Sequence, residues 1–245
     1  MKEYNVSDIV KDVRIAIDQN TNDSDLGGFC DMDTLELADV VKGKIVDAAW
    51  MIEGAAPVYM CGDGSAQKKT EVTLSKVNTS DKYSYAVVDV PSDYLRLVSF
   101  RMNDWVSGVY EVITPDDPDY SKQRSRIEGV RGNIERPVLA IVPSMNTEGN
   151  NKSGNVFEAY STNSNVCEYK YVPIPKIENE KILLCERLYK AIVYATAYLV
   201  ALAYNADTQA MRLLSTARSL ADIDGNEQQR SQYVQQPITT EQAEQ

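Results

Sequence analysis

The sequence predicts an α+β protein. N-terminal helices and a long C-terminal helix form a helical bundle, and an antiparallel β region is inserted between them. Apolar residues recur at helical spacing near the start of the chain and again after Pro175. Between residues 71 and 172 the apolar period is two instead, as in half-buried strands. We therefore expect four regions. N-terminal helices cover 1–60, and a β-rich insertion with long loops covers 61–175. A C-terminal helix or helix pair over 176–223 packs on the N-terminal helices, and a polar, Gln-rich tail over 224–245 docks on a partner.

Two helices are predicted in the first region. Valine and isoleucine recur every three or four positions from Val6 onward, which predicts a first helix over about residues 5–19. Asp33 followed by Glu36 is typical of a helix N-cap with its capping-box partner. A second helix is expected behind this cap, over about residues 34–53, closed by the glycine and proline that follow.

The β region is predicted from short stretches rich in β-branched and aromatic residues, separated by Pro, Gly, Asn and Asp. Among them are EVTLSKV, YSYAVVDV, YLRLVSF, VYEVI, PVLAIV, NVFEAY and CEYKYV. No helical stretch alternates with these strands, so an antiparallel arrangement is favoured over βαβ units. The segments 114–136 and 143–154 are long and polar and are expected to be exposed loops.

The C-terminal helical pattern leaves two alternatives. Leucine, isoleucine and alanine step by four and three from Leu184 to Leu202, which predicts a helix over about residues 179–222. The helix could also break near Asn205, with Asp207 capping a second piece. Unbroken, about 40 residues would span ~60 Å, so such a helix would need partner surface from the N-terminal helices or from neighbouring subunits.

Composition limits the classes of function. The net charge is −11, which argues against a general binder of nucleic acid or of anionic membranes, because phosphate binding depends on clustered Lys and Arg. The chain has no histidine and therefore lacks the commonest general base and metal ligand. Its four cysteines form no C-x-x-C motif, so we expect free thiols in a reducing compartment. We predict no enzyme, no metal and no cofactor.

No stretch predicts a membrane segment or a secretion signal. The first residues, MKEYNVSDIV, contain no apolar core of a signal peptide. The longest run without a charge, Ala191–Ala206, has 16 residues and includes three tyrosines, whereas a membrane-spanning helix needs ~20 apolar residues. A buried helix is the better interpretation of this run.

Three motifs suggest site chemistry but depart from the patterns that this chemistry requires. GDGSAQKKT (62–70) has Gln67 where a phosphate loop has glycine, and it follows a predicted helix instead of a strand. NDSDLGGFCDMDT (22–34) has Thr34 where a calcium loop requires a bidentate glutamate. The aspartates of TPDDPDYS lie between prolines, so turn formation explains them.

One basic cluster stands out, KQRSRIEGVRGNIERP at residues 122–137. Glu128 and Glu135 are interleaved with its basic residues, which disfavours a direct grip on DNA. An acidic protein that oligomerises offers acidic surface of its own, so we interpret the cluster as a contact with a protein partner. Trp and Arg are the usual interface anchors. The expected intersubunit or partner contacts are Tyr94, Arg101, Trp105, Arg124, Arg126, Arg131 and, in the tail, Tyr233.

The stretch VPSDYLRLVSF (90–100) resembles a recurrent element of head–tail connector proteins of tailed phages, where such a run follows N-terminal helices and opens the β region. The sequence LRLVSFRMNDW, together with the basic cluster, is most similar to ring proteins of crAss-like Bacteroides phages. The resemblance covers nearly the whole chain in architecture, whereas its sequence-specific part is confined to about residues 88–140.

This resemblance implies a structural virion protein at the head–tail junction, assembled in the cytoplasm of the bacterial host. It implies a twelvefold ring of this chain, bound to the portal protein and to further tail or ring proteins. Genomic DNA would pass through the ring without specific binding, and no membrane or cofactor is involved. Two alternatives stay open: another tail component, such as a stopper, hub or cargo protein, and a ligand-binding module or enzyme built on the β region.

Overall fold

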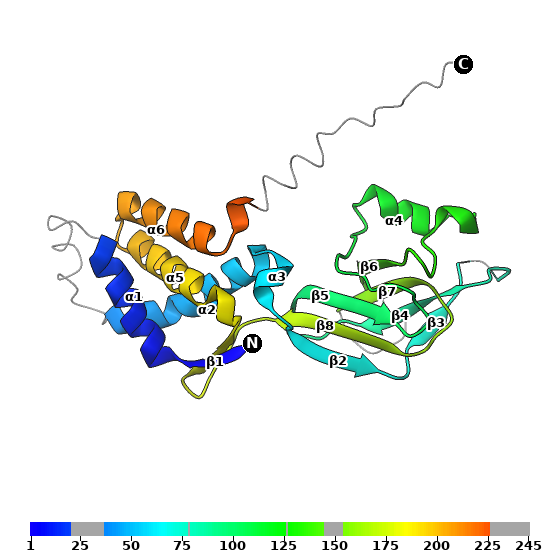
Figure 1. Cartoon of the computed structure of the whole chain (residues 1–245), viewed down its shortest axis with the longest axis horizontal. Helices are drawn as coiled ribbons and strands as arrows, with labels where there is room; N and C mark the ends of the chain where they lie inside the picture. The colour runs from blue at the N-terminus through cyan, green and yellow to red at the C-terminus, as the bar shows by residue number, and fades with distance from the viewer. Residues whose placement is uncertain (21–36, 78, 126, 145–153, 226–245) are drawn as a thin grey trace, which may run out of the picture. The chain divides into compact units, whose positions relative to one another are not determined.

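The computed structural model describes residues 1–20, 37–77, 79–125, 127–144 and 154–225. The chain divides into two compact units. The helical unit comprises Met1–Gly62 and Pro175–Gln245, and the β unit comprises Asp63–Ile174. Helices occur together with antiparallel sheets, which confirms the predicted α+β class (Figure 1).

The helical unit is built around one buried helix. Its helices are α1 (Val6–Asn20), α2 (Leu37–Ala55), α3 (Val58–Cys61), α5 (Tyr189–Ala203) and α6 (Asp207–Leu220). Helix α5 packs against α1, α2 and α6, and alanine, valine and isoleucine occupy most of its buried positions. Such an apolar helix is stable because its neighbours remove several of its faces from water. None of the described helices is both long and apolar enough to cross a membrane.

The two N-terminal helices agree with the predicted ranges, whereas the C-terminal pattern contains a break. The first predicted helix is α1 and the second is α2, although the expected cap at Asp33 lies outside the described residues. Helices α5 and α6 are separated at Tyr204–Ala206, and Asn205 has a φ of 57°. Asp207 is not the N-cap of α6, because it is the first residue of the helix. The N-cap position is Ala206, and no side chain forms a capping hydrogen bond there.

A small sheet in the helical unit was missed by the sequence analysis. Strands β1 (Lys2–Asn5), β10 (Lys181–Leu184) and β9 (Ile177–Glu178) pair in the order β1-β10-β9, and a short turn of 3-10 helix follows at Glu186–Leu188. The predicted start of the C-terminal helix at about 179 is therefore wrong, and α5 begins ten residues later. Leu184 fits the helical spacing, but it is a strand residue paired with Lys2 near the N-terminus.

The β unit contains two antiparallel sheets. One has the order β2 (Ser65–Lys69), β8 (Cys167–Pro173), β5 (Tyr94–Met102). The other has the order β3 (Thr73–Ser75), β4 (Ser84–Asp89), β7 (Asn155–Thr162), β6 (Val138–Pro143). Phe100 and Tyr169 of the first sheet pack on Phe157 of the second, with ring centroids 5.8 and 6.0 Å away. The two sheets thus share one aromatic core.

The segment between β5 and β6 differs from its prediction. VYEVI (109–113) is not a full strand, because it forms only isolated bridges, from Val109 to Phe100 and from Ile113 to Ala140. Residues 114–136 are not a plain exposed loop. They contain α4 (Pro118–Gln123) and a 3-10 turn (Glu128–Val130), and Ile113 and Tyr120 pack on the outer face of the β3-β4-β7-β6 sheet. Strand β7 is consequently buried on both faces.

Candidate functional site

Trp105 was predicted to anchor an interface, but the structure buries it. Only 1% of its surface is exposed, and its ring packs on Phe100 with centroids 5.7 Å apart. Its Nε1 donates to the Ser161 carbonyl at 3.3 Å. The large aromatic surface and the indole N–H are both satisfied inside the β unit. Trp105 therefore holds its loop on the sheets and is not available to a partner.

The residues just before Trp105 tie the end of β5 to the β7–β8 turn. Asp104 accepts from Thr162 Oγ1 at 2.6 Å and from the Asn163 backbone N–H at 2.8 Å. Arg101 stays exposed, and its Nη2 donates to the Trp105 carbonyl at 3.2 Å. In this stretch Arg101 is thus the charged side chain that reaches the surface, and its contact with a partner stays a prediction.

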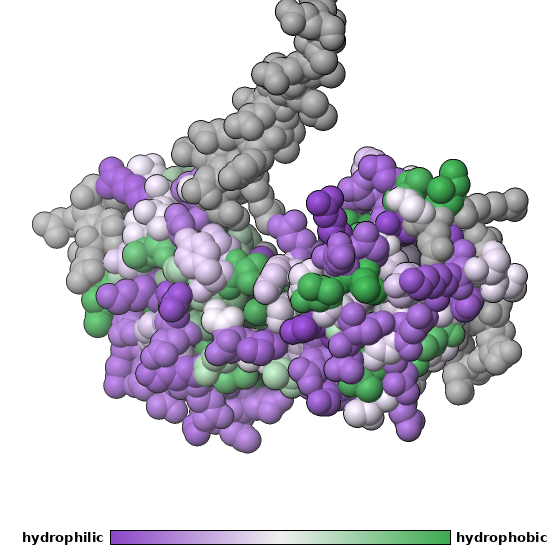
Figure 2. Space-filling view, turned by 45° about the vertical axis from the view of Figure 1, so that its right-hand side comes forward, coloured by the Kyte–Doolittle hydropathy of each residue, from purple (hydrophilic) through white to green (hydrophobic). Residues whose placement is uncertain are grey.

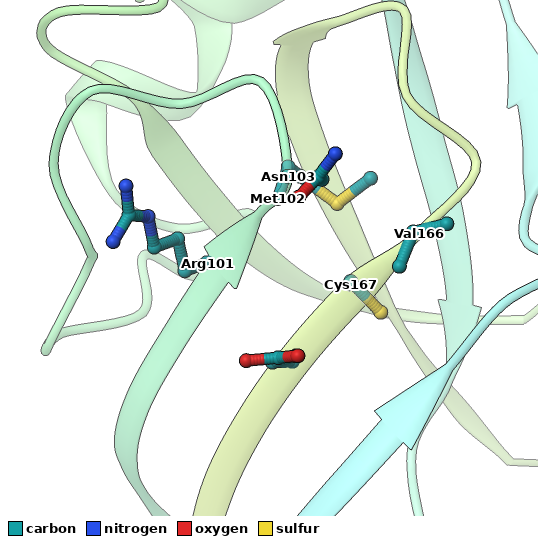
Figure 3. A pocket seen from close by; sticks show the side chains of 6 residues that line it. Arg101, Met102, Asn103, Val166 and Cys167 are labelled. Carbon is teal, nitrogen blue, oxygen red and sulfur yellow. The ribbon is translucent and has the colours of Figure 1, made fainter.

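A small pocket opens beside Arg101, where β5 ends and β8 begins (Figure 3). It encloses about 220 Å³ and is lined by Arg101, Met102, Asn103, Val166, Cys167 and Glu168. Burial raises the pKa of the Cys167 thiol to about 11, so this thiol is protonated and unreactive at neutral pH. Glu168 is already paired with Lys68 at 2.8 Å. The groups that line the pocket are thus a protonated thiol and a paired carboxylate.

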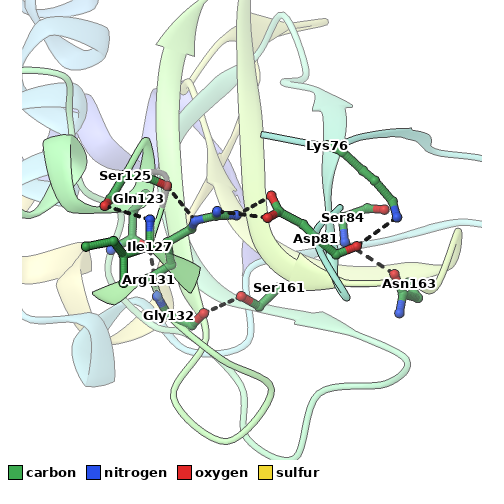
Figure 4. A network of polar contacts seen from close by, with 10 residues as sticks. All are labelled: Lys76, Asp81, Ser84, Gln123, Ser125, Ile127, Arg131, Gly132, Ser161 and Asn163. Carbon is green, nitrogen blue, oxygen red and sulfur yellow. Dashed lines mark hydrogen bonds and ion pairs between the residues drawn. The ribbon is translucent and has the colours of Figure 1, made fainter. Parts of the chain in front are cut away.

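Arg131 forms a buried ion pair. Like Trp105, it was predicted to contact a partner but is buried within the β unit. Its two terminal nitrogens donate to the carboxylate of Asp81 at 2.7 and 3.1 Å, and only 5% of each side chain is exposed. Its Nε donates to the Ser125 carbonyl at 2.8 Å (Figure 4). Bidentate pairing of a guanidinium fixes both position and orientation. The pair therefore fastens the 124–136 segment to the strand region.

Gly132 completes this anchor through its backbone. Its N–H donates to Gln123 Oε1 at 2.8 Å, and its carbonyl accepts from the Ser161 hydroxyl (Figure 4). A Cβ at this position would lie 2.8 Å from the Val138 side chain. Glycine is thus required for the close approach of this segment to β6.

Arg124 has a mixed role. It pairs with the buried carboxylate of Glu158, which also accepts from the hydroxyls of Tyr160 at 2.5 Å and Tyr120 at 3.3 Å. The guanidinium lies 5.2 Å from the ring centre of Tyr85. Burial, followed by the hydrogen bond to Glu158, raises the pKa of Tyr160, so this hydroxyl stays a donor. The Arg124 side chain is 40% exposed, so it stabilises the fold through Glu158 and still has surface that another molecule can contact.

Tyr94 is half-buried and belongs to the aromatic core. It meets Phe157 edge-on at 5.3 Å and lies 6.1 Å from Tyr171. Burial raises the pKa of its hydroxyl to about 12. Arg126 and Tyr233 lie outside the described residues. The predicted residues are thus not gathered into one patch, since two are buried anchors and Tyr94 is a core residue.

The anchored loops expose apolar side chains that the sequence does not predict. We define the loop surface as Val106, Tyr110, Ile127 and Val130; the first three are 67%, 63% and 66% exposed. Their two loops are joined by a backbone hydrogen bond of 2.9 Å from Val106 to Ile134. Figure 2 shows apolar side chains (green) among polar ones on the surface. Val106 and Tyr110 are four positions apart and Ile127 and Val130 are three apart, but neither pair belongs to a longer periodic run, so sequence pattern could not find them.

The helical unit also exposes a large aromatic side chain that was not predicted. Trp50 on α2 is 57% exposed. Asp47, Gly54 and Gly43 lie three, four and seven positions from Trp50 on the same helix face, and all are exposed. A Cβ added at Gly43 or Gly54 would have no atom within 4 Å. We define these four residues as the α2 outer face.

The described residues contain no cluster of three or more His, Cys, Asp or Glu side chains that could hold a metal ion. No protein-family model matches the chain, and no curated protein matches it.

Proposed function

We propose that the chain is a structural virion protein that forms a ring between the portal and the tail of a tailed phage and provides a channel for DNA. The resemblance of residues 88–140 to connector ring proteins gives the starting point. The observation that carries the proposal is the loop surface, because its apolar side chains are held out to water by loops that are themselves tightly anchored.

Anchored loops favour protein association for a physical reason. A loop that must become ordered on binding loses conformational entropy, and this loss weakens the complex. Here the buried pair Arg131–Asp81 and the ring of Trp105 fix the loops before any partner arrives. Large apolar groups presented in a fixed geometry are typical of interface cores. Arg101 and the exposed part of Arg124 supply charged groups on the same unit.

The helical unit would supply the second contact of each subunit. In this proposal α1, α2, α5 and α6 act as the bundle, and the α2 outer face meets a neighbouring copy. Trp50 is a typical anchor residue for such an interface. Glycine in a helix interior costs roughly 0.5–1 kcal/mol relative to alanine. A close partner backbone would explain why glycine occupies position 43, where no atom of the described residues lies within 4 Å of an added Cβ.

The charge of the chain suits DNA passage. Of the net charge of −11, residues 1–60 contribute −7, from 12 acidic and five basic side chains. An acidic wall repels phosphate, so DNA can slide past without being retained.

The test is the mass of the native assembly, measured by native mass spectrometry for the chain alone and with the portal protein, with images of the particles by negative-stain electron microscopy. We expect a closed ring, twelvefold as the resemblance implies. Exchange of Val106 and Ile127 for serine should release subunits, whereas Leu183→Ser on β10, also an exposed apolar position, should leave the ring intact. A monomer under all conditions, with and without portal protein, would refute the proposal.

A further inference from the structure

A shallow groove lies between α1 and α5, which pack against each other in the helical unit (Figure 1). It encloses about 230 Å³, and its apolar lining comes from Ile15 and Ala16 of α1 and from Val193 and Tyr194 of α5. Ile15 is 52% exposed, although Ala16 beside it is buried. An engineered apolar cavity of about 150 Å³ binds benzene, so a groove of this size has room for one large aromatic side chain.

The rim of the groove is polar and offers both a hydrogen-bond acceptor and a cation. Asp12 accepts from the Tyr189 hydroxyl at 2.6 Å, and a carboxylate can accept further hydrogen bonds. Lys190 also lines the groove, is exposed and forms no ion pair with another residue that the structure describes. Tryptophan matches such a site, because it combines a large apolar ring with one N–H donor.

The exposed tryptophan of the helical unit, Trp50, points away from α5 of its own chain. Helix α2 packs on α5, and Val41, Ile45 and Ile52 are among its buried residues. Trp50 lies on the opposite side of the helix, because successive residues are turned by about 100°. Its side chain is 57% exposed. An indole that fills the groove is therefore supplied by a second copy of the chain.

The residues that flank Trp50 match those that flank the groove when α2 of one copy lies parallel to α5 of the next. Asp47, about one turn before Trp50, then lies beside Lys190. Asp47 is exposed and has no ion pair within the described part of the chain, so opposite charges meet. Gly54, about one turn after Trp50, then faces the half-buried Tyr198, one turn beyond the groove. Each turn advances about 5.4 Å along either helix, so the three contacts form in one register.

We propose that Trp50 of one copy inserts into the groove between α1 and α5 of the next copy. Its indole N–H donates to Asp12, and Asp47 of the same helix pairs with Lys190. Two different surfaces meet in this contact, so association is head-to-tail and closes into a ring when the rotation allows. The inference rests on the proposed ring function and names the surface that the α2 outer face contacts.

Disulfide trapping between two variants of the full chain tests the contact. One variant carries Asp47→Cys and the other Lys190→Cys, both in a Cys30→Ser background. Position 30 lies outside the described residues, and the other three native cysteines are buried. Oxidised glutathione supplies the oxidant: the two protein thiols lose two electrons and two protons, and it is reduced to two molecules of glutathione. We expect the mixture to form a disulfide-linked heterodimer, identified by mass spectrometry of the linked peptides.

The matched control replaces the Lys190→Cys chain with a Met211→Cys chain, since Met211 on α6 is 62% exposed. Position 190 should link to position 47 at least ten-fold faster than position 211 does. Adding Ile15→Glu to the Lys190→Cys chain places a charge in the groove and should remove this advantage. Trp50→Ala in the Asp47→Cys chain should remove it too. Both substituted side chains are largely exposed, so far-UV circular dichroism should show an unchanged fold.

The outcomes separate this contact from the ring function. Equal rates at positions 190 and 211, in a mixture that native mass spectrometry shows as rings, would overturn the contact and leave the ring function intact. Faster links between two Asp47→Cys chains would also overturn it, because α2 would then pack on α2 of another copy. A fast link at position 190 in particles that are not rings would support the contact and refute the ring alone. A mixture that stays monomeric, with and without portal protein, would overturn both.

Discussion

The two units of this chain are stabilised in different ways. The helical unit buries apolar residues of α5 between neighbouring helices, and its pattern repeats every three or four positions. The β unit also has an apolar core, but its long segments are fastened by buried charges, Arg131 with Asp81 and Glu158 with Arg124. Repetitive packing makes compact helices, whereas specific polar pairs hold irregular loops in fixed positions and leave their apolar side chains exposed.

The largest effect is expected when the buried ion pair Arg131–Asp81 is broken, which tests whether this pair holds the 124–136 segment on the β unit. Arg131→Met leaves the Asp81 carboxylate buried without its guanidinium, which costs about 3–5 kcal/mol of unfolding free energy for a buried pair. The loss should appear in urea unfolding monitored by near-UV circular dichroism, and the loop surface should lose protection from proteases.

The control for this variant is Lys68→Met, which breaks an ion pair with Glu168 whose side chains are both well exposed. Exposed pairs contribute about 0–1 kcal/mol, so little change is expected. If Arg131→Met and Lys68→Met lowered the free energy of unfolding equally, the buried ion pair would contribute no more than an exposed one. The proposed difference between the β unit and the helical unit would then be wrong.

A second, smaller effect is expected at Arg124. Arg124→Met removes the charge that balances Glu158, but the guanidinium is partly exposed, so we expect a loss of about 1–3 kcal/mol. Glu158→Gln combined with Arg124→Met should recover part of this loss, because no buried charge then remains. Calorimetric unfolding of both variants provides the measurement. A purely interfacial Arg124 would change assembly and leave subunit stability untouched.

The comparison also explains what the sequence could reveal. Helices α1 and α2 and most strands of the β unit were predicted, because their signals lie within a few neighbouring residues. The small β1-β10-β9 sheet is not predicted because β1 and β10 lie far apart in the sequence. Sequence alone predicts Trp105 and Arg131 as interface contacts, because their internal partners Ser161 and Asp81 are 56 and 50 residues away. Local pattern cannot distinguish a buried polar pair from a surface charge.

The helical unit has its own buried carboxyl group, which allows a test by pH. Burial raises the pKa of Glu53, although the Cys185 backbone N–H, 2.7 Å from Oε1, opposes the shift. Protonation of Glu53 adds to the free energy of unfolding, and this contribution is fully present below the ordinary pKa of 4.5. It is lost as the pH rises through the raised pKa of the folded state. Glu53→Gln keeps the acceptor and removes the charge, so it should be more stable than the parent at pH 7.

This gain should shrink as the pH falls toward 4.5, which urea titrations at several pH values would show. Glu178→Gln on β9, an exposed position, should change stability by no more than about 0.5 kcal/mol. A loss of stability in Glu53→Gln at every pH would mean that the carboxylate is stabilising, and that the helical unit also depends on a buried charge.

The smallest effect is expected at Gly43, where one substitution should change the stability of the subunit and the stability of the ring in opposite directions. Gly43→Ala adds a methyl group into open space on α2, so the isolated subunit should gain about 0.5–1 kcal/mol. If a neighbouring backbone approaches the α2 outer face, the same methyl should weaken the ring measured by native mass spectrometry. Ser215→Ala on α6 also raises helix propensity at an exposed position and should leave assembly unchanged. A Gly43→Ala subunit that is more stable and assembles normally would exclude this face from the interface and leave the loop surface as the main contact.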